Sequence, residues 1–196
     1  MKRIAILASG AGSNANTIID YFRYHQDIKV QCIICNNSKA GVIDIAVKNK
    51  IPYYVILRTD LYETDTVINL LTELKIDLIV LAGFLWLIPD KIIKRFKAEI
   101  INIHPALLPK YGGKGLYGSR VHEAVINAGE KQTGITIHFV NEQYDEGEII
   151  FQEHFPITES DNIHSVQMKI HELEHIWYPK IIEQLLSKKI KFKPCT

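Results

Sequence analysis

The sequence predicts an α/β fold: a Rossmann-like open twisted sheet, mostly parallel, with an antiparallel C-terminal portion and helices on both faces. Apolar runs of strand length alternate with amphipathic stretches of helix length through the first half of the chain. The strands are almost wholly apolar, which is typical of a parallel sheet covered by helices on both faces. The last two predicted strands are joined by too few residues for a helical crossover and should therefore pair antiparallel.

The elements of the first half follow from this alternation. Continuous apolar runs predict strands, and amphipathic stretches predict helices. In chain order we expect a strand at 3–8, a helix at 14–24, a strand at 30–35, a helix at 41–50, a strand at 53–57, a helix at 61–74, a strand at 78–82, a short helix at 89–96 and a strand at 100–103.

The second half changes character. A helix is expected at 121–127, followed by strands at 134–140 and 149–155 with only residues 141–148 between them. A long helix at 162–187 closes the pattern, with a kink expected near Pro179 because proline removes a backbone donor. No repeat, low-complexity segment or linker interrupts the chain, so residues 1–196 are expected to form a single domain.

Composition and charge exclude several classes of function. With 196 residues, 47% of them hydrophobic, the chain is long enough for one sizeable core. The formal net charge is only +1, and the densest basic run, 188–193, is interpreted as a solvated terminus, so nucleic acid is not an expected partner. No run approaches the roughly 20 apolar residues of a membrane-spanning helix, and the apolar start is too short for a signal peptide.

Three cysteines, Cys32, Cys35 and Cys195, do not form the even framework of a small secreted protein. A reducing cytosol fits best, and we expect a cytoplasmic protein. Cys32 and Cys35 match C-x-x-C, but residues three apart in a strand point to opposite faces. We therefore interpret them as small core residues and not as a redox or metal pair.

A glycine loop follows the first strand. "SGAGSN" places Gly12, Ser13 and Asn14 at the start of the first helix, where unpaired N–H groups and the helix dipole favour an anion. Gly10-x-Gly12-x-x-Ala15 fits the loose dinucleotide fingerprint, but the acid expected about 20 residues on is missing. The loop therefore suits a single phosphate group; the alternative is a tight turn with Ser13 as the N-cap.

A second polar cluster ends the strand at 100–103. Asn102 and His104 are two residues apart and share one face of the strand, and Pro105 stiffens the chain that follows. Asn102 can donate a hydrogen bond to a developing oxyanion while His104 moves protons. The later loop offers three acids, Asp145, Glu146 and Glu148, and an aspartate near the ring would favour the imidazolium form of His104 and raise its pKa. A plain strand-end histidine is the alternative.

A family resemblance is carried by five motifs in order: "SGAGSN", "LAGFLWLIP", "INIHPALLPKYGG", "GITIHFVNEQYDEGEIIFQ" and "ELEHIWYP". Together they span nearly the whole chain, which resembles the folate-dependent formyltransferases, in particular those of purine biosynthesis. The resemblance implies the formyltransferase fold and transfer of a formyl group from 10-formyltetrahydrofolate to the amine of glycinamide ribonucleotide. Folate is then a co-substrate, and neither metal nor redox cofactor is required.

The resemblance also implies residue roles. Asn102 matches the oxyanion stabiliser, His104 the general acid, and Asp145 the carboxylate that tunes the histidine. The residues implied for the nucleotide are Gly12, Ser13, Asn14 and Glu174, and those implied for the folate, mostly through backbone contacts, are Leu85, Trp86, Leu87 and Ile88 together with Asn102. The partners are small molecules, and the chain is expected to be a monomer or a homodimer.

Two positions depart from the family pattern. Family members commonly have an arginine where Trp86 stands and another near Thr64, and neither position is basic here. The stretch 112–118 is also longer than expected. It could supply alternative contacts to the folate tail through Lys110 and Lys114.

Other functions remain as alternatives. "HELEH" places His171 and His175 on one helix face with Glu174 between them, a spacing that could hold zinc in a metallohydrolase. Against it, no third histidine follows at the usual spacing. Hydrolysis of 10-formyltetrahydrofolate needs the same constellation, but the phosphate loop and the lack of an extra domain before Met1 favour transfer. Formylation of initiator tRNA would need an added RNA-binding domain, and a binding module without chemistry would not need the catalytic trio.

Overall fold

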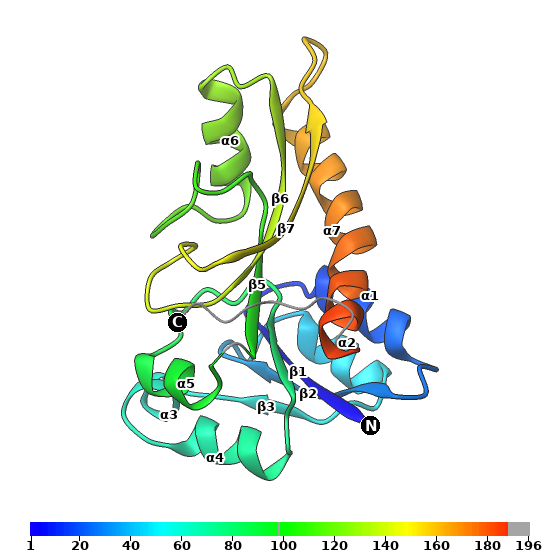
Figure 1. Ribbon diagram of the computed structural model, residues 1–196, viewed down its shortest axis with the longest axis vertical. Coiled ribbons are helices and arrows are strands. Elements are labelled where there is room, and N and C mark those ends of the chain that lie inside the picture. Colours follow the sequence, from blue (N-terminus) through cyan, green and yellow to red (C-terminus); the bar gives the residue numbers. More distant parts are fainter. Residues whose placement is uncertain (98, 188–196) are drawn as a thin grey trace.

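Figure 1 shows the computed structural model, which describes residues 1–97 and 99–187. The basic run at 188–193 and Cys195 lie outside the described residues. The strands are β1 (Lys2–Ala8), β2 (Ile28–Cys35), β3 (Tyr53–Val55), β4 (Leu78–Leu81), β5 (Ile100–His104), β6 (Gln132–Phe139) and β7 (Ile149–Pro156). The helices are α1 (Ser13–Phe22), α2 (Val42–Lys48), α3 (Arg58–Tyr62), α4 (Thr66–Glu73), α5 (Asp90–Arg95), α6 (Ser119–Asn127) and α7 (Ile163–Leu186).

Within the described residues the strands form one sheet in the order β3-β2-β1-β4-β5-β6-β7. Neighbours from β3 to β5 pair in parallel, whereas β6 runs antiparallel to β5 and β7 antiparallel to β6. This confirms the predicted mostly parallel sheet with an antiparallel C-terminal portion. The strand order reverses between β1 and β4, and the carboxyl ends of these two strands mark the switch point where open α/β sheets bind ligands.

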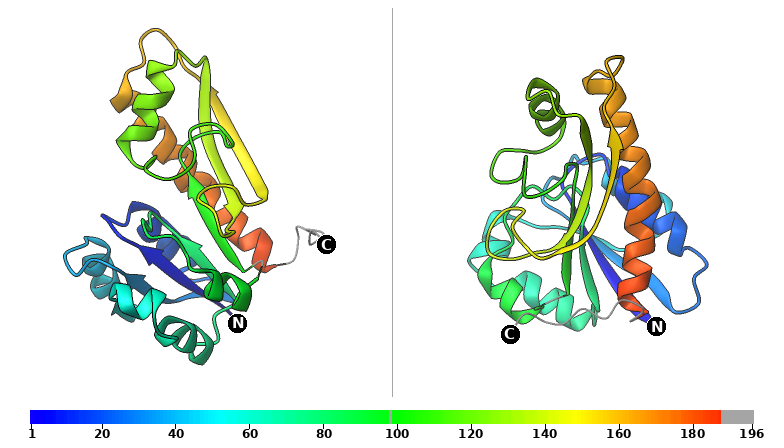
Figure 2. Two further views of the ribbon diagram at one scale, coloured as in Figure 1. Left: turned by 90° about the vertical axis from the view of Figure 1, so that its left-hand side faces the viewer. Right: turned by 45° about the horizontal axis from the view of Figure 1, so that its top comes forward.

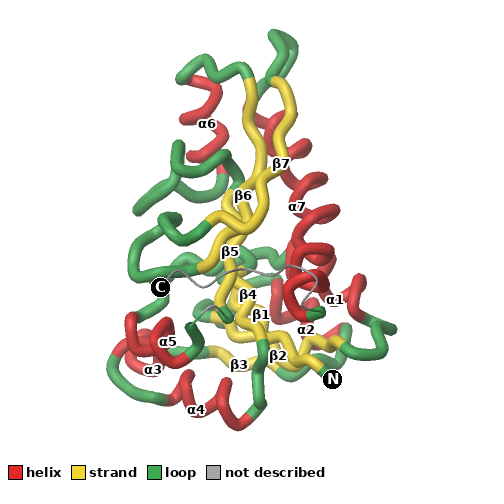
Figure 3. Tube along the Cα trace, in the orientation of Figure 1, coloured by secondary structure: helices red, strands yellow, loops and turns green. Residues whose placement is uncertain are grey.

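The sheet has a separate apolar core on each face. One core joins the sheet to α1, α2 and α7, and the other joins it to α3, α4 and α5. Figures 1 and 2 show these two helix layers, and Figure 3 shows β6 and β7 extending beyond the parallel strands alongside α7. Tyr178, fully buried in α7, donates a hydrogen bond to the Leu81 carbonyl at 2.8 Å and so ties the last helix to the centre of the sheet.

The cysteine interpretation is confirmed by the packing. Cys32 belongs to the core beneath α3, α4 and α5, and Cys35 to the opposite core. Both are buried and free, and burial raises the pKa of the Cys32 thiol to about 12. A thiol that stays protonated and inaccessible behaves as a small core residue.

The single helix predicted at 61–74 is wrong, because α3 ends at Tyr62 and α4 begins at Thr66. Leu61 and Val67 are both buried in the same core. In one continuous helix, a spacing of six residues would point their side chains in clearly different directions. The break brings both side chains onto the sheet. The long helix is confirmed and continues past Pro179 as α7. None of the helices in the described part of the chain combines the length and apolarity needed to cross a membrane.

Candidate functional site

The site lies at the switch point, where loops from the carboxyl ends of β1, β4 and β5 meet. A cleft of about 650 Å³ opens there, and every site residue expected from the sequence lines it. These residues are Gly12, Ser13, Asn14, Leu85, Trp86, Leu87, Ile88, Asn102, His104, Asp145 and Glu174. Segments that are far apart in the sequence therefore contribute to one cavity.

The glycine loop is built around a backbone conformation that favours glycine. Gly12 has φ 83° and caps α1, so the alternative in which Ser13 is the N-cap does not hold. A Cβ on Gly12 would lie 2.8 Å from the Cβ of Val42, a distance that real Cβ contacts essentially never show. Glycine therefore lets the loop pass close to α2 and leaves the Ser13 and Asn14 side chains facing the cleft.

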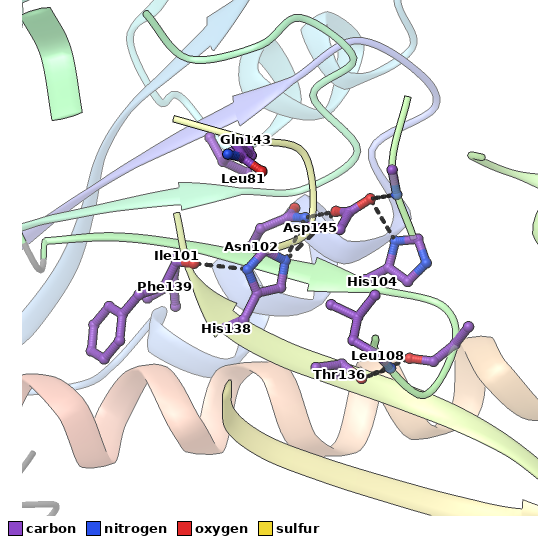
Figure 4. Close-up of polar contacts among 12 residues, drawn as sticks. Leu81, Ile101, Asn102, His104, Leu108, Thr136, His138, Phe139, Gln143 and Asp145 are labelled. Atoms are coloured by element: carbon purple, nitrogen blue, oxygen red, sulfur yellow. Dashed lines mark hydrogen bonds and ion pairs between the residues drawn. The ribbon is translucent and has the colours of Figure 1, made fainter. Parts of the chain in front are cut away.

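Asp145 is the centre of the polar cluster (Figure 4). Its Oδ1 accepts a hydrogen bond from Asn102 Nδ2 at 3.3 Å, and its Oδ2 lies 3.5 Å from His104 Nδ1. The Gly113 backbone N–H also donates to Oδ2, at 2.9 Å. The structure thus brings the three predicted catalytic side chains into direct contact.

His138 completes this cluster and was missed by the sequence reasoning. It pairs with Asn102 across β5 and β6, and its Nε2 lies 3.2 Å from Asn102 Nδ2 and 3.7 Å from Asp145 Oδ1. The register of the two antiparallel strands would have predicted this contact, because directly opposite residues in two strands project from the same face of a sheet. The strands were expected to be neighbours, but their register was not.

The electrostatics of the cluster differ from the expectation for His104. Burial lowers the pKa of His104 and outweighs both the nearby Asp145 carboxylate and the hydrogen bond to the Tyr111 carbonyl, which raise it. Asp145 does act to raise the pKa of His104, as predicted, but the predicted net direction is wrong because burial has the larger effect. Burial alone would raise the pKa of Asp145, yet the His138 and His104 rings and the Gly113 N–H together hold it below its usual value. At neutral pH the cluster therefore pairs a carboxylate with a neutral imidazole.

Hydrogen bonds to backbone carbonyls indicate where each ring carries its proton. His104 Nε2 lies 2.8 Å from the Tyr111 carbonyl oxygen, which can only accept, so Nε2 carries the hydrogen and Nδ1 is the basic nitrogen. His138 Nδ1 likewise faces the Phe139 carbonyl at 2.8 Å, which leaves its Nε2 to accept from Asn102. Both N–H groups of Asn102 are then engaged within the protein, one by His138 and one by Asp145.

The other end of the cleft is built by α1 and α7. Asn14 Nδ2 donates to Glu174 Oε2 at 3.0 Å, and His171 Nδ1 lies 3.2 Å from the same oxygen. Glu174 is only 5% exposed although it carries a carboxylate. The hydrogen bond to Glu174 is the main cause that raises the pKa of His171. A buried carboxylate is thus held beside the glycine loop.

The segment after β4 forms the third wall. Ser9 Oγ accepts from the Leu85 backbone N–H at 3.0 Å, and Tyr62 Oη donates to the Leu87 carbonyl at 2.9 Å, so this backbone is fixed at two points. The Trp86 ring packs beside Tyr62, and the Arg58 guanidinium lies 5.7 Å from its centroid.

The two lysines expected to replace the family's arginines lie in different places. Lys114 lines the cleft, together with the rest of the stretch from Gly113 to Gly118. Lys110 instead forms an ion pair with Glu130 at 2.8 Å and borders a smaller cavity. Only Lys114 is in position to meet a ligand in the cleft.

Part of the "HELEH" motif belongs to this site. Glu174 and His171 face the cleft, and the rings of His171 and His175 lie 6.2 Å apart. Within residues 1–97 and 99–187, no three histidine, cysteine or acidic side chains are placed to hold a metal ion together. The hydrogen bond to Glu174 occupies the His171 Nδ1 atom.

Comparison with known proteins agrees with this geometry. A family model described as formyl transferase matches residues 2–182. A phosphoribosylglycinamide formyltransferase from Haemophilus influenzae is 39% identical, covering 98% of this chain and 91% of the relative. The Bacillus subtilis protein of the same name is 36% identical, covering 95% of this chain and 96% of the relative.

A solved structure shows the same fold. The phosphoribosylglycinamide formyltransferase of Anaplasma phagocytophilum superimposes with a TM-score of 0.90 at 34% identity, covering 98% of this chain and 90% of that one. The chain therefore belongs to the formyl transferase family, among relatives that are phosphoribosylglycinamide formyltransferases.

Proposed function

We propose that this chain transfers the formyl group of 10-formyltetrahydrofolate to the amine of glycinamide ribonucleotide, a step of purine biosynthesis. The observation that carries the proposal is one cleft that joins a phosphate-type glycine loop to the Asn102, His104 and Asp145 cluster. The products are N-formylglycinamide ribonucleotide and tetrahydrofolate. Two relatives that are phosphoribosylglycinamide formyltransferases, at 39% and 36% identity, support the same reaction.

The reaction exchanges one carbon–nitrogen bond for another. The substrate amine attacks the formyl carbon, a tetrahedral oxyanion forms, and the bond from that carbon to N10 of the folate breaks. The amine loses one proton and N10 gains one, so a single group that moves a proton balances the reaction. Neither step changes an oxidation state.

His104 is suited to move that proton. Its basic Nδ1 takes the proton from the amine as the new bond forms, which gives an imidazolium whose Nδ1 lies 3.5 Å from Asp145 Oδ2. The carboxylate stabilises this cation, and the imidazolium then protonates the leaving nitrogen. A lowered pKa in the free site fits this role, because the ring must begin neutral to act first as a base.

Asn102 is suited to stabilise the oxyanion. Its Nδ2 bond to Asp145 is 3.3 Å long and the bond to His138 is 3.2 Å, so an oxyanion near Nδ2 can replace one of two long contacts. The His138 ring, held at Nδ1 by the Phe139 carbonyl, fixes the other N–H of the amide. Preorganised donors of this kind are often the largest single contribution to catalysis.

The substrates divide the cleft between them. We assign the nucleotide to Gly12, Ser13, Asn14 and Glu174, and the folate to the backbone of Leu85, Trp86, Leu87 and Ile88. The two hydrogen bonds to that backbone, from Tyr62 and to Ser9, support its use as a fixed edge for a flat ring. The buried, free Cys32 and Cys35 fit a reducing cytoplasm.

The test is the absorbance change of folate deformylation by purified protein with a 10-formyl folate, after metal chelation, with and without glycinamide ribonucleotide. Turnover that needs the nucleotide and survives chelation establishes the transferase and excludes the zinc hydrolase. Turnover without the nucleotide identifies a hydrolase. A His104→Ala protein that kept full activity would contradict the assignment of the proton carrier.

A further inference from the structure

His122 is a buried side chain in the cleft that the mechanism above does not use. It lies in the middle of α6, is 3% exposed, and lines the same cavity as Glu174 and His171. Its Nδ1 is buried without a hydrogen-bond partner, and among the described residues its ring accepts and donates no hydrogen bond. Most buried polar atoms in proteins are paired, so an unpaired ring at a cleft wall calls for an explanation.

The surroundings of His122 are rich in acceptors. Glu174, on the neighbouring α7, is the charged group that acts on the ring most strongly. Asn14 Oδ1 is also buried without a partner, although Asn14 Nδ2 is bonded to Glu174. A carboxylate, an unpaired amide oxygen and an unpaired imidazole thus belong to residues that line the same cleft.

The chemistry of these groups determines which part of a nucleotide they can bind. A phosphate in direct contact with Glu174 would be repelled by the carboxylate, so the phosphate belongs on the backbone N–H groups of the glycine loop and not against Glu174 itself. A hydroxyl group can donate to Glu174 or Asn14 Oδ1 and can pair with a neutral imidazole in either of its tautomers. Burial lowers the pKa of His122, which keeps the ring neutral at physiological pH. A pair of sugar hydroxyls fits this chemistry best.

We propose that His122 is a further substrate-binding residue, which forms a hydrogen bond with a sugar hydroxyl of the nucleotide substrate. The proposal rests on the proposed function, since it names the group of that substrate that α6 recognises. In the free protein Nδ1 is unpaired and enclosed, and the part of the ring that lines the cleft is where the nucleotide's hydroxyl binds.

The test compares the wild-type protein with His122→Phe, which keeps an aromatic ring and removes both nitrogens. Calorimetry measures the Kd of glycinamide ribonucleotide and of its 2′-deoxy and 3′-deoxy analogues, and kinetics measure the KM of the folate. We expect His122→Phe to bind the ribonucleotide about threefold to tenfold more weakly, the range for one neutral hydrogen bond, with the folate KM unchanged. The variant should also lose the wild-type preference over one deoxy analogue.

A purely structural role makes a different prediction. Because the His122 Nδ1 has no partner in the free protein, His122→Phe breaks no hydrogen bond, and its Tm should not fall. A lower Tm with unchanged discrimination between the ribonucleotide and both analogues would overturn the proposal. If His122→Phe fails to fold, His122→Leu takes its place: weaker binding of the ribonucleotide with loss of the preference over one deoxy analogue supports the proposal, and unchanged discrimination overturns it.

His154→Gln is the matched control, because His154 lies on β7 with an exposed side chain outside the cleft. It should bind all three nucleotides as the wild-type protein does. If the wild-type protein does not bind glycinamide ribonucleotide, the proposed function fails as well. If it binds and formylates the nucleotide while His122→Phe discriminates normally, only the role of His122 is refuted.

Discussion

Asp145 is the residue on which the proposed chemistry depends most, and Asp145→Asn tests it. The carboxylate contacts both Asn102 and His104, so its neutral replacement removes the charge that stabilises the imidazolium. The backbone at Asp145 has φ 58°, a left-handed conformation that asparagine tolerates about as well as aspartate. We therefore expect kcat to fall by roughly a hundredfold or more while the fold is retained, measured by steady-state kinetics and circular dichroism.

Glu146→Gln is the matched control for that variant. Glu146 is the next residue of the same loop, it is exposed, and it does not line the cleft. This change also removes one negative charge from the loop but should leave kcat within a factor of about two. Equal activity of the two variants would mean that Asp145 acts only through the general charge of the loop.

At the residue scale, the sequence indicated which residues belong to the site but not which of them touch one another. Asn102 and His104 share a strand face, which period-two alternation predicts. The contact of Asp145 with Asn102, 43 positions away, was expected only from the family resemblance. His138 needed the register of β5 and β6, and the pKa direction of His104 needed its burial, which depends on the packing of every element around it.

At the scale of elements, the turn from β1 to α1 makes a prediction about stability. Gly12→Ala forces a Cβ to within 2.8 Å of Val42 and places alanine at φ 83°. We expect a loss of roughly 1–3 kcal/mol, a Tm lower by about 3 °C or more, and a raised KM for the nucleotide. Gly10→Ala is the control, since a Cβ there meets nothing within 4 Å. Two variants of equal Tm would show that α2 yields to the added methyl group.

The loop before α6 makes a prediction about ligand binding. Lys114 lines the cleft, whereas Lys110 is paired with Glu130 outside it. Lys114→Met should therefore raise the KM of a folate with an anionic tail by about threefold to tenfold, through loss of one charge interaction, and Lys110→Met should not. Steady-state kinetics with varied folate measure both. A change only in the nucleotide KM would assign Lys114 to the other substrate.

The elements themselves were largely predictable, because apolar runs and amphipathic stretches report on local burial. The failure at 61–74 shows the limit of this reasoning. A continuous apolar pattern in the sequence does not reveal that one helix has ended and another has begun. With a spacing of six residues, Leu61 and Val67 face the same core because the helix breaks between them. The N-cap of α1 could not be decided from the sequence for a similar reason, since the close approach of Val42 to Gly12 is a tertiary contact.

At the scale of the whole molecule, the sheet order explains why one cleft receives residues from so many segments. Reversal between β1 and β4 separates the loops that follow these strands and leaves a crevice between them. The antiparallel β6 then carries His138 back beside β5, and α7 carries Glu174 to the glycine loop. The parallel part of the sheet thus builds the cleft, and its antiparallel extension adds a residue of the proposed catalytic cluster.

The same burial makes the stability of the molecule sensitive to acid. Burial lowers the pKa of His104, His122 and His175 below the usual 6.5, whereas Glu174 raises that of His171. A histidine whose pKa is lower in the folded protein than in the unfolded chain stabilises the fold at pH values above its unfolded-state pKa. This contribution is lost as the pH falls through its folded-state pKa. Three such groups outnumber the one that acts in the opposite direction.

We therefore expect the free energy of unfolding, measured by urea titration, to decrease between about pH 7 and pH 5. The carboxylates with lowered pKa, Asp145 among them, lose their contribution only below about pH 4, outside this window. His122→Phe removes one buried titrating group, so its free energy of unfolding should fall less over the same range. An equal fall in the variant would mean that the His122 ring takes up a proton as readily in the folded protein as in the unfolded chain, and a steeper fall would mean that it does so more readily; either result contradicts a neutral ring held at the cleft.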